Sequence, residues 1–202
     1  MARKTEEVRA KLREKLTDIA ERTIAEHGMG ALKARTLASE AGCAVGQVYN
    51  VFDDMTGLIL AVNLRTFGRM GTDIRLAVGA KADAAPVERL VAMADAYLAF
   101  AAANPLLWRT LFDVEMSAEK DVPIWYMEEL NGLFTIIAAP LTEMYDSKSA
   151  DEIDLMVRTL FSSIHGIVLL GLEKRISGVP LPRIEAMIST LLTNATARAP
   201  KF

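Results

Sequence analysis

The chain has 202 residues, of which 51% are hydrophobic and 24% are charged, and its formal net charge is −3. These values are typical of a soluble globular protein with one large domain or two small ones, and they exclude a protein that binds nucleic acid over its whole surface. A single cysteine, Cys43, excludes an internal disulfide and a cysteine-based zinc site.

The sequence predicts neither a membrane span nor an export signal. Its longest apolar run, at about residues 160–172, is interrupted by serines, a histidine and glycines. The run is shorter than the ~18 to 20 residues that cross a bilayer. The N-terminal segment is charged rather than apolar, unlike a secretory leader. We therefore expect a cytoplasmic protein without a membrane partner.

Charge is distributed unevenly along the chain. Residues 1–50 contain nine lysines and arginines against seven acidic residues, whereas the remaining residues carry an excess of acidic groups. A weakly basic N-terminal segment on an acidic body permits a local contact with phosphates without requiring one.

Helical periodicity extends through nearly the whole chain, and no stretch shows the sustained alternation of a strand, so we predict an all-α fold. The first helix is expected to begin near Thr5 and to end at His27-Gly28. Its apolar residues recur at spacings of three and four: Val8, Leu12, Leu16, Ile19 and Ile24.

About nine helices are expected in total. Small residues between Gly79 and Pro86 separate two strongly periodic segments, and Pro86 is typical of a first helical position. Gly68 and Gly71 weaken the helix before this break, and Pro140 is expected to strain or kink a later one. The helices predicted after the first are 34–41, 45–52, one from Thr56, 86–103, 105–113, 123–145, 150–176 and 182–198.

Residues 34–52 hold the most specific motif. Two short helices that cross steeply need a small residue at the contact, a turn residue that tolerates a left-handed backbone, and a branched apolar residue on the second helix. Ala38, Gly42 and Val48 meet these needs at the spacings of a helix-turn-helix unit. An ordinary helical corner, which also favours alanine and glycine, is the alternative.

The wider pattern resembles the TetR family of bacterial repressors over the first third of the chain. The matching residues are Gly28, Arg35 to Ala38, Ala41-Gly42, Val45 to Phe52, and Leu58. The resemblance implies a three-helix helix-turn-helix DNA-binding domain at residues 1–55, followed by a helical ligand-binding and dimerisation domain at residues 56–202. It implies a transcriptional regulator, most simply a ligand-responsive repressor, that acts on a double-stranded DNA operator.

Later segments are similar to the C-terminal domain of the family's WHG-type subgroup, at residues 103–112 and 163–168. The chain also departs from the family pattern. Met55 replaces a common lysine beside two acidic residues, which weakens one expected phosphate contact. In addition, Ala44 and Gln47 replace small hydroxyl residues.

If residues 45–52 form the recognition helix, Val48, Val51 and Phe52 face inward. Gln47 then offers a paired donor and acceptor to adenine, and the Tyr49 hydroxyl contacts a phosphate. The basic Arg3, Lys4 and Arg9 follow the DNA backbone or enter the minor groove, or else have no role. The predicted DNA-binding residues are Arg35, Thr36, Ala44, Gly46, Gln47, Tyr49 and Asn50, several of which solvent exposure alone would also explain.

Bulky apolar side chains in the second half suggest a site for a small, largely apolar ligand, although such residues also form ordinary cores. The predicted ligand-binding residues are Met93, Tyr97, Trp108, Phe112, Trp125, Phe134, Phe161 and His165. A ligand that displaces the segment 105–113 is expected to tilt the helix carrying Gly68 and Gly71, and thereby to change the spacing of two DNA-binding heads.

A homodimer is predicted from the last two helices. In the helix 150–176, apolar residues cover more than one face. In the helix 182–198 a stripe is formed by Ile184, Met187, Ile188, Leu191 and Leu192. These apolar faces need a partner, and a second copy of the chain supplies one. Two heads spaced by a helical turn of DNA match a palindromic operator.

Catalytic motifs are absent from the sequence. With two histidines and no metal-binding, nucleotide-binding or nucleophile motif, we expect neither an enzyme nor a metal or other cofactor. The remaining alternative is an all-α adaptor that binds proteins rather than DNA. A strongly salt-dependent affinity for duplex DNA would distinguish a regulator from such an adaptor.

Overall fold

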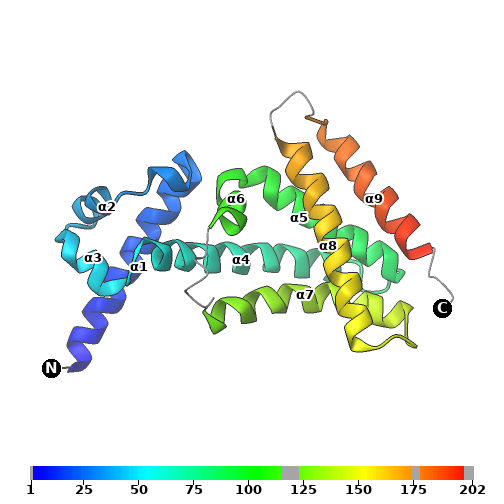
Figure 1. Cartoon of the computed structure of the whole chain (residues 1–202), viewed down its shortest axis with the longest axis horizontal. Helices are drawn as coiled ribbons and strands as arrows, with labels where there is room; N and C mark the ends of the chain where they lie inside the picture. The colour runs from blue at the N-terminus through cyan, green and yellow to red at the C-terminus, as the bar shows by residue number, and fades with distance from the viewer. Residues whose placement is uncertain (1, 115–122, 174–177, 198–202) are drawn as a thin grey trace. The chain divides into compact units, whose positions relative to one another are not determined.

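A computed structural model describes residues 2–114, 123–173 and 178–197, with side chains from Glu6 onward. These residues form nine α-helices and one short 3-10 turn without a strand, which confirms the all-α prediction (Figure 1). The helices are α1 (Ala2–His27), α2 (Ala34–Ala41), α3 (Val45–Val51), α4 (Met55–Gly79), α5 (Pro86–Ala103), α6 (Pro105–Asp113), α7 (Ile124–Met144), α8 (Ala150–Leu172) and α9 (Leu181–Ala197), and the 3-10 turn η1 is Met29–Ala31.

Predicted and observed helix bounds agree closely. The short helices α2 and α3 fall at the expected residues to within one position, and α5 and α6 begin and end as predicted. Helix α1 begins earlier than expected, at Ala2, and α7 continues through Pro140. Helix α8 ends at Leu172, and the last residues of its predicted range lie outside the described residues.

The chain forms two compact units. The first comprises Met1–Gly68 and Asn104–Tyr126, and the second comprises Arg69–Ala103 and Met127–Phe202. The first unit, called the head below, contains α1 to α3, the start of α4, and α6. The predicted domain division after residue 55 stays a prediction.

A single hydrophobic core holds the head together. Helix α1 contributes Leu16 and Ile24, which are fully buried, and α6 contributes Leu107. Val8, the first residue of the apolar periodicity in this helix, is 61% exposed because the core covers α1 only from Leu12 onward. The buried members are Leu16, Ile19, Ala20, Ile24, Leu37, Ala38, Ala41, Val48, Val51, Phe52, Leu58, Val62 and Leu107.

The turn between α2 and α3 depends on Gly42. Its backbone is left-handed, with φ 69° and ψ 36°. The Gly42 N–H donates to the Ser39 carbonyl, and the next N–H, from Cys43, donates to the Ala38 carbonyl at 2.9 Å. This pair of bonds closes α2 with a Schellman motif, in which glycine avoids the penalty that a Cβ would impose.

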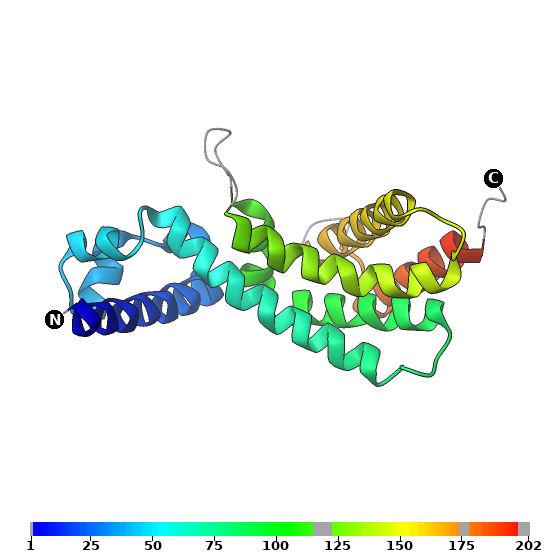
Figure 2. The same ribbon diagram turned by 90° about the horizontal axis from the view of Figure 1, so that it is seen from below.

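In the second unit, α5, α8 and α9 pack against one another, and α8 lies beside α9 (Figure 2). Ile184, Ile188 and Leu192 recur every four residues along α9 and are at most 1% exposed. These residues were predicted to belong to a dimer stripe, but they face the core of their own unit. Gly171 of α8 admits this packing, since a Cβ there would lie 2.6 Å from the Ile184 side chain.

Helix α8 exposes two large apolar side chains, Leu155 and Leu170, among polar ones. Over an 18-residue window its mean hydropathy is 1.7, and 17% of that window is buried. By length and composition alone α8 could cross a membrane, but the core helix of a soluble protein passes the same test.

Candidate nucleic-acid interface

Helix α3 separates cleanly into a buried face and an exposed face. Val48, Val51 and Phe52 are at most 5% exposed, as predicted. The seven predicted DNA-binding residues all have exposed side chains or backbone: Arg35, Thr36, Ala44, Gly46, Gln47, Tyr49 and Asn50. The exposed residues of α3 thus form a face with an aromatic hydroxyl and two amides, groups that hydrogen-bond phosphates and base edges.

Gln47 is engaged with the start of its own helix. Its side-chain oxygen Oε1 accepts a hydrogen bond from the Ala44 backbone N–H at 3.0 Å. Ala44 is the N-cap residue of α3 and has no side-chain group that could cap the helix. Gln47 therefore supplies one half of a capping box, and the usual hydroxyl half is missing.

Basic residues of α1 hold the helix-turn-helix pair in place. Arg13 Nη1 donates to the Val51 carbonyl at 3.2 Å, and its guanidinium lies 4.3 Å from the centre of the Phe52 ring. Lys15 Nζ donates to the Ala41 carbonyl at 2.9 Å. Both cations sit at a helix C-terminus, where unpaired carbonyls and the helix dipole favour positive charge.

The start of α4 carries an acidic cap. Asp54 Oδ1 accepts a hydrogen bond from the Gly57 N–H at 2.8 Å, which is the bonding expected of an N-cap residue. Met55, which replaces the lysine common in the resembling family, is partly buried and packs against the head core. A carboxylate thus occupies the helix terminus where a phosphate would otherwise be favoured.

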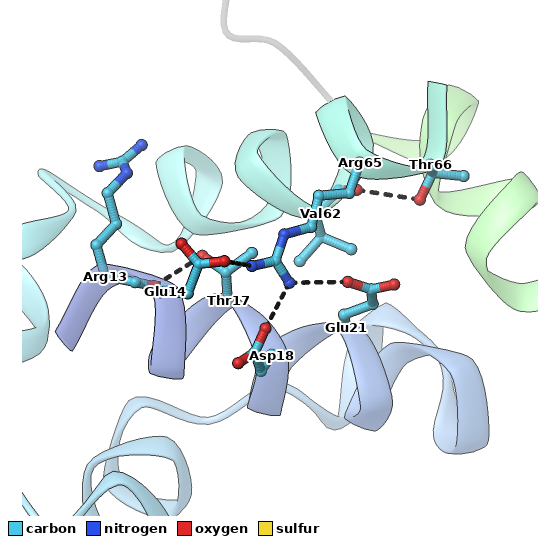
Figure 3. Close-up of polar contacts among 8 residues, drawn as sticks. All are labelled: Arg13, Glu14, Thr17, Asp18, Glu21, Val62, Arg65 and Thr66. Carbon is cyan, nitrogen blue, oxygen red and sulfur yellow. Dashed lines mark hydrogen bonds and ion pairs between the residues drawn. The ribbon is translucent and has the colours of Figure 1, made fainter. Parts of the chain in front are cut away.

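Arg65 joins α4 to α1. Its guanidinium contacts Asp18 at 2.7 Å and both Glu21 and Glu14 at 3.0 Å (Figure 3). Partial burial lowers the pKa of Arg65, but its hydrogen bonds to Asp18 and Glu21 outweigh this and raise it above its ordinary value. One cation therefore links three carboxylates of α1 to the helix that continues into the second unit.

A second link joins α4 to α6 within the head. Asn63 is fully buried, and its Nδ2 donates to the Thr110 carbonyl at 3.1 Å and lies 3.5 Å from the Tyr126 hydroxyl. Burial of Tyr126 raises the pKa of its hydroxyl. Because α6 also supplies Leu107 to the head core, a displacement of α6 would be transmitted directly to α1.

Four of the predicted ligand-binding residues come together in the second unit. The Tyr97 hydroxyl lies 2.8 Å from His165 Nδ1, and the Phe161 ring stacks on the imidazole with centroids 5.8 Å apart. Phe134 meets Phe161 edge to face at 5.3 Å. Burial lowers the pKa of His165, which favours the neutral imidazole at neutral pH.

The other predicted ligand residues lie elsewhere. Met93 is 5% exposed and belongs to the core of the second unit. Trp108, Phe112 and Trp125 belong to the head. Trp108 is buried and meets Phe112 at 5.6 Å, whereas Phe112 and Trp125 are each 39% exposed. Half of the predicted set, including His165 itself, thus forms one cluster in the second unit. The three residues of the head belong to the other unit.

Sequence reasoning missed Arg65 and Asn63. A signal for the first was present, because Glu14, Asp18 and Glu21 are spaced by four and three residues and so share one face of α1. The predicted contacts of Arg3 and Lys4 involve side chains outside the described residues, and Arg9 is exposed.

Comparison with known protein families decides the class. Residues 16–62 match the model of bacterial regulatory proteins of the tetR family, and residues 90–195 match a tetracyclin repressor-like C-terminal domain. The chain belongs to the TetR family. The two matched segments contain the helix-turn-helix pair and nearly all of the helices α5 to α9, so this is the fold of a DNA-binding transcriptional regulator. The WHG-type subgroup stays a prediction.

Solved structures show the same fold. A protein of unknown function from Rhodococcus sp. RHA1 is 23% identical, with a TM-score of 0.74 over 91% of this chain and 94% of that one. The TetR family regulator PfmR from Thermus thermophilus is 14% identical, with a TM-score of 0.61 over 93% and 100% of the two chains.

A third TetR fold is the transcriptional regulator FadR from Bacillus subtilis, solved in complex with stearoyl-CoA. It is 19% identical, with a TM-score of 0.62 over 89% of this chain and 96% of that one. No curated protein matches this TetR chain.

Proposed function

We propose that this TetR family regulator is a repressor that binds a palindromic operator as a homodimer and releases it when an apolar ligand binds. The exposed face of α3 carries the DNA-binding part of the proposal. Gln47, Tyr49 and Asn50 point away from a core that fixes α3 through Val48 and Val51. A helix of this size fits the major groove of B-DNA.

Selection of bound sequences from random duplex DNA tests this function and yields the operator. A palindrome with half-sites about one helical turn apart is expected, with an affinity that falls steeply as salt increases. Failure to enrich any sequence, or an affinity independent of salt, would contradict operator binding. The substitution Tyr49→Phe removes only the hydroxyl and should weaken binding to all sequences alike, since a phosphate contact carries no base preference.

The exposed apolar surface of α8 and α9 supports the dimer. Leu155 and Leu170 on α8 are 67% and 61% exposed, and Met187 on α9 is 42% exposed. An open groove of about 800 Å³ lies between these helices, with Ile167 and Leu191 in its lining. A second copy of this surface would cover both helices, and the contact would form a closed two-fold interface.

The aromatic cluster around His165 supports the ligand. The Tyr97 and Phe161 rings contact the imidazole, Phe134 packs against Phe161, and the hydrogen bond of His165 to Tyr97 supplies a polar anchor. The ligand class is proposed to be an apolar chain with one polar end. Because FadR binds stearoyl-CoA on the same fold, long-chain acyl-CoA thioesters are the first probe.

Thermal-shift measurements with acyl-CoA thioesters of increasing chain length test the ligand. A ligand that binds only the folded state raises the melting temperature, and in this proposal it also lowers operator affinity. Phe161→Ala should abolish both effects. Phe112→Ala, which removes a ring from the head rather than from the cluster, should leave ligand binding intact. Stabilisation without loss of operator affinity would contradict the coupling.

A further inference from the structure

We propose that Gln47 reads guanine through its Nε2 donors alone, because its acceptor oxygen caps α3. This inference rests on the proposed function, in which the exposed face of α3 enters the major groove. Sequence reasoning assigned Gln47 to adenine, a contact that uses the side-chain oxygen and nitrogen together. The structure commits that oxygen to the Ala44 N–H at 3.0 Å.

The cap bond follows from an unusual N-terminus. Helix α3 begins after Ala44, whose methyl group accepts no hydrogen bond, so no N-cap side chain stabilises the first turn. Gln47 is the third residue of the helix, the position from which a side chain reaches back to the N-cap N–H. Loss of this bond would leave the first turn of a seven-residue helix without any side-chain cap.

The remaining half of the amide is a pure donor. A glutamine amide has one oxygen acceptor and an NH2 group with two donors. With Oε1 held on the Ala44 N–H, the exposed Nε2 has no hydrogen-bond partner among the residues that the structure describes. Guanine places two acceptors, N7 and O6, side by side in the major groove, whereas adenine offers N7 beside an amino donor. A donor-only side chain therefore favours guanine over adenine.

Two substitutions separate the cap from the donor. Gln47→Lys keeps donors but has no acceptor, so it should retain the guanine preference at the base that Gln47 reads. Gln47→Glu keeps the cap acceptor but has no donor, so it should lose that preference. For the wild type we expect operators with guanine to bind about 5- to 150-fold tighter than those with adenine at this base.

The operator selected from random DNA is the starting point, and its bases are then changed one pair at a time. The base read by Gln47 is the one whose substitution weakens the wild type but not Gln47→Ala. Replacing its guanine by 7-deazaguanine removes N7 and should weaken the wild type and Gln47→Lys. Replacing it by inosine leaves the major-groove acceptors unchanged and should have no effect.

Amide hydrogen exchange reports the cap independently of DNA affinity. In the free protein the Ala44 amide should exchange several-fold faster in Gln47→Lys than in the wild type, and at the wild-type rate in Gln47→Glu. In the operator complex of the wild type this amide should stay protected.

The outcomes distinguish the two proposals. If no operator is enriched, the proposed function fails. If an operator is bound but adenine is preferred at the Gln47 position, and Gln47→Lys converts this preference to guanine, the donor-only contact is refuted while the proposed function stands. The donor-only contact would also be refuted if no base of the operator depended on Gln47 for its recognition.

Discussion

Basic residues near the N-terminus divide into two groups by what they contact. Arg13 and Lys15 cap the C-terminal ends of α3 and α2, and Arg22 pairs with Glu40. Arg9 and Arg35 have exposed side chains. The excess positive charge of residues 1–50 is therefore used in part to assemble the head, and the charge available to DNA is smaller than the sequence count.

Arg65→Gln is expected to lower the free energy of unfolding by about 1–3 kcal/mol, because it leaves three carboxylates of α1 without their shared cation. Urea denaturation measures the change. Arg158→Gln is the control, since it breaks an exposed pair with Asp154 within one helix and a contact of the guanidinium with the Phe134 ring at 5.4 Å, and it should change stability much less. Equal effects of the two substitutions would contradict the role given to Arg65.

Protonation of His165 is expected to destabilise the fold. Burial lowers the pKa of His165 in the folded state, so its contribution to stability is complete above the unfolded value of about 6.5 and is lost as pH falls through the folded pKa. The melting temperature should therefore fall as pH decreases from 6.5, and less steeply in His165→Asn. A slope unaffected by His165→Asn would contradict the assignment.

At the scale of elements, the sequence predicts the helices well because their limits depend on local signals. Pro86 and Pro105 stand at the first residue of α5 and α6, and Gly28 and Gly42 have positive φ where helices end. Packing partners are different, because they depend on contacts between distant residues. Asn63 and Thr110 are 47 positions apart, and no local pattern connects them.

Gly42→Ala should destabilise the head by about 1–2 kcal/mol through backbone strain alone, since a Cβ there meets no atom within 4 Å. Gly46→Ala is the control, because Gly46 lies inside α3 with equally open surroundings, and alanine should stabilise the helix by about 0.5–1 kcal/mol. Thermal unfolding measures both. Opposite signs are expected, and two destabilising substitutions would show that space rather than backbone conformation limits this turn.

Gly171→Ala should destabilise the second unit by about 1–3 kcal/mol, because its Cβ would lie 2.6 Å from Ile184, which is buried between α8 and α9. Gly166→Ala lies in the same helix with nothing within 4 Å and should be stabilising by about 0.5–1 kcal/mol. Comparison of the two urea midpoints tests the close approach of α8 and α9. A tolerated Gly171→Ala would mean that Ile184 moves aside without cost.

At the scale of the whole molecule, apolar residues serve two kinds of contact that the sequence does not distinguish. The stripe predicted on α9 includes Ile184 and Ile188, which face their own unit, and Met187, which is exposed. Periodicity shows that such a helix has an apolar face, but the boundary between core and outer surface depends on where α5 and α8 pack. The predicted ligand-binding residues are likewise divided between the head and the second unit, because the sequence shows that they are bulky and apolar but not which helices they pack against.

Met187→Glu is expected to dissociate the proposed homodimer, because a two-fold interface would contain the carboxylate twice, each copy without a partner. A loss of about 3 kcal/mol would raise the dimer dissociation constant roughly 100-fold, measurable by analytical ultracentrifugation at micromolar concentration. Since Met187 is 42% exposed, the fold should tolerate the change. Leu76→Glu alters a leucine that is 68% exposed on α4 and should leave the dimer intact.

The monomer produced by Met187→Glu should also lose affinity for the full palindrome while still binding a half-site, because one head contacts only half of the operator. A wild-type protein that sediments as a monomer would refute the dimer, and an unchanged dimer in Met187→Glu would place its interface elsewhere.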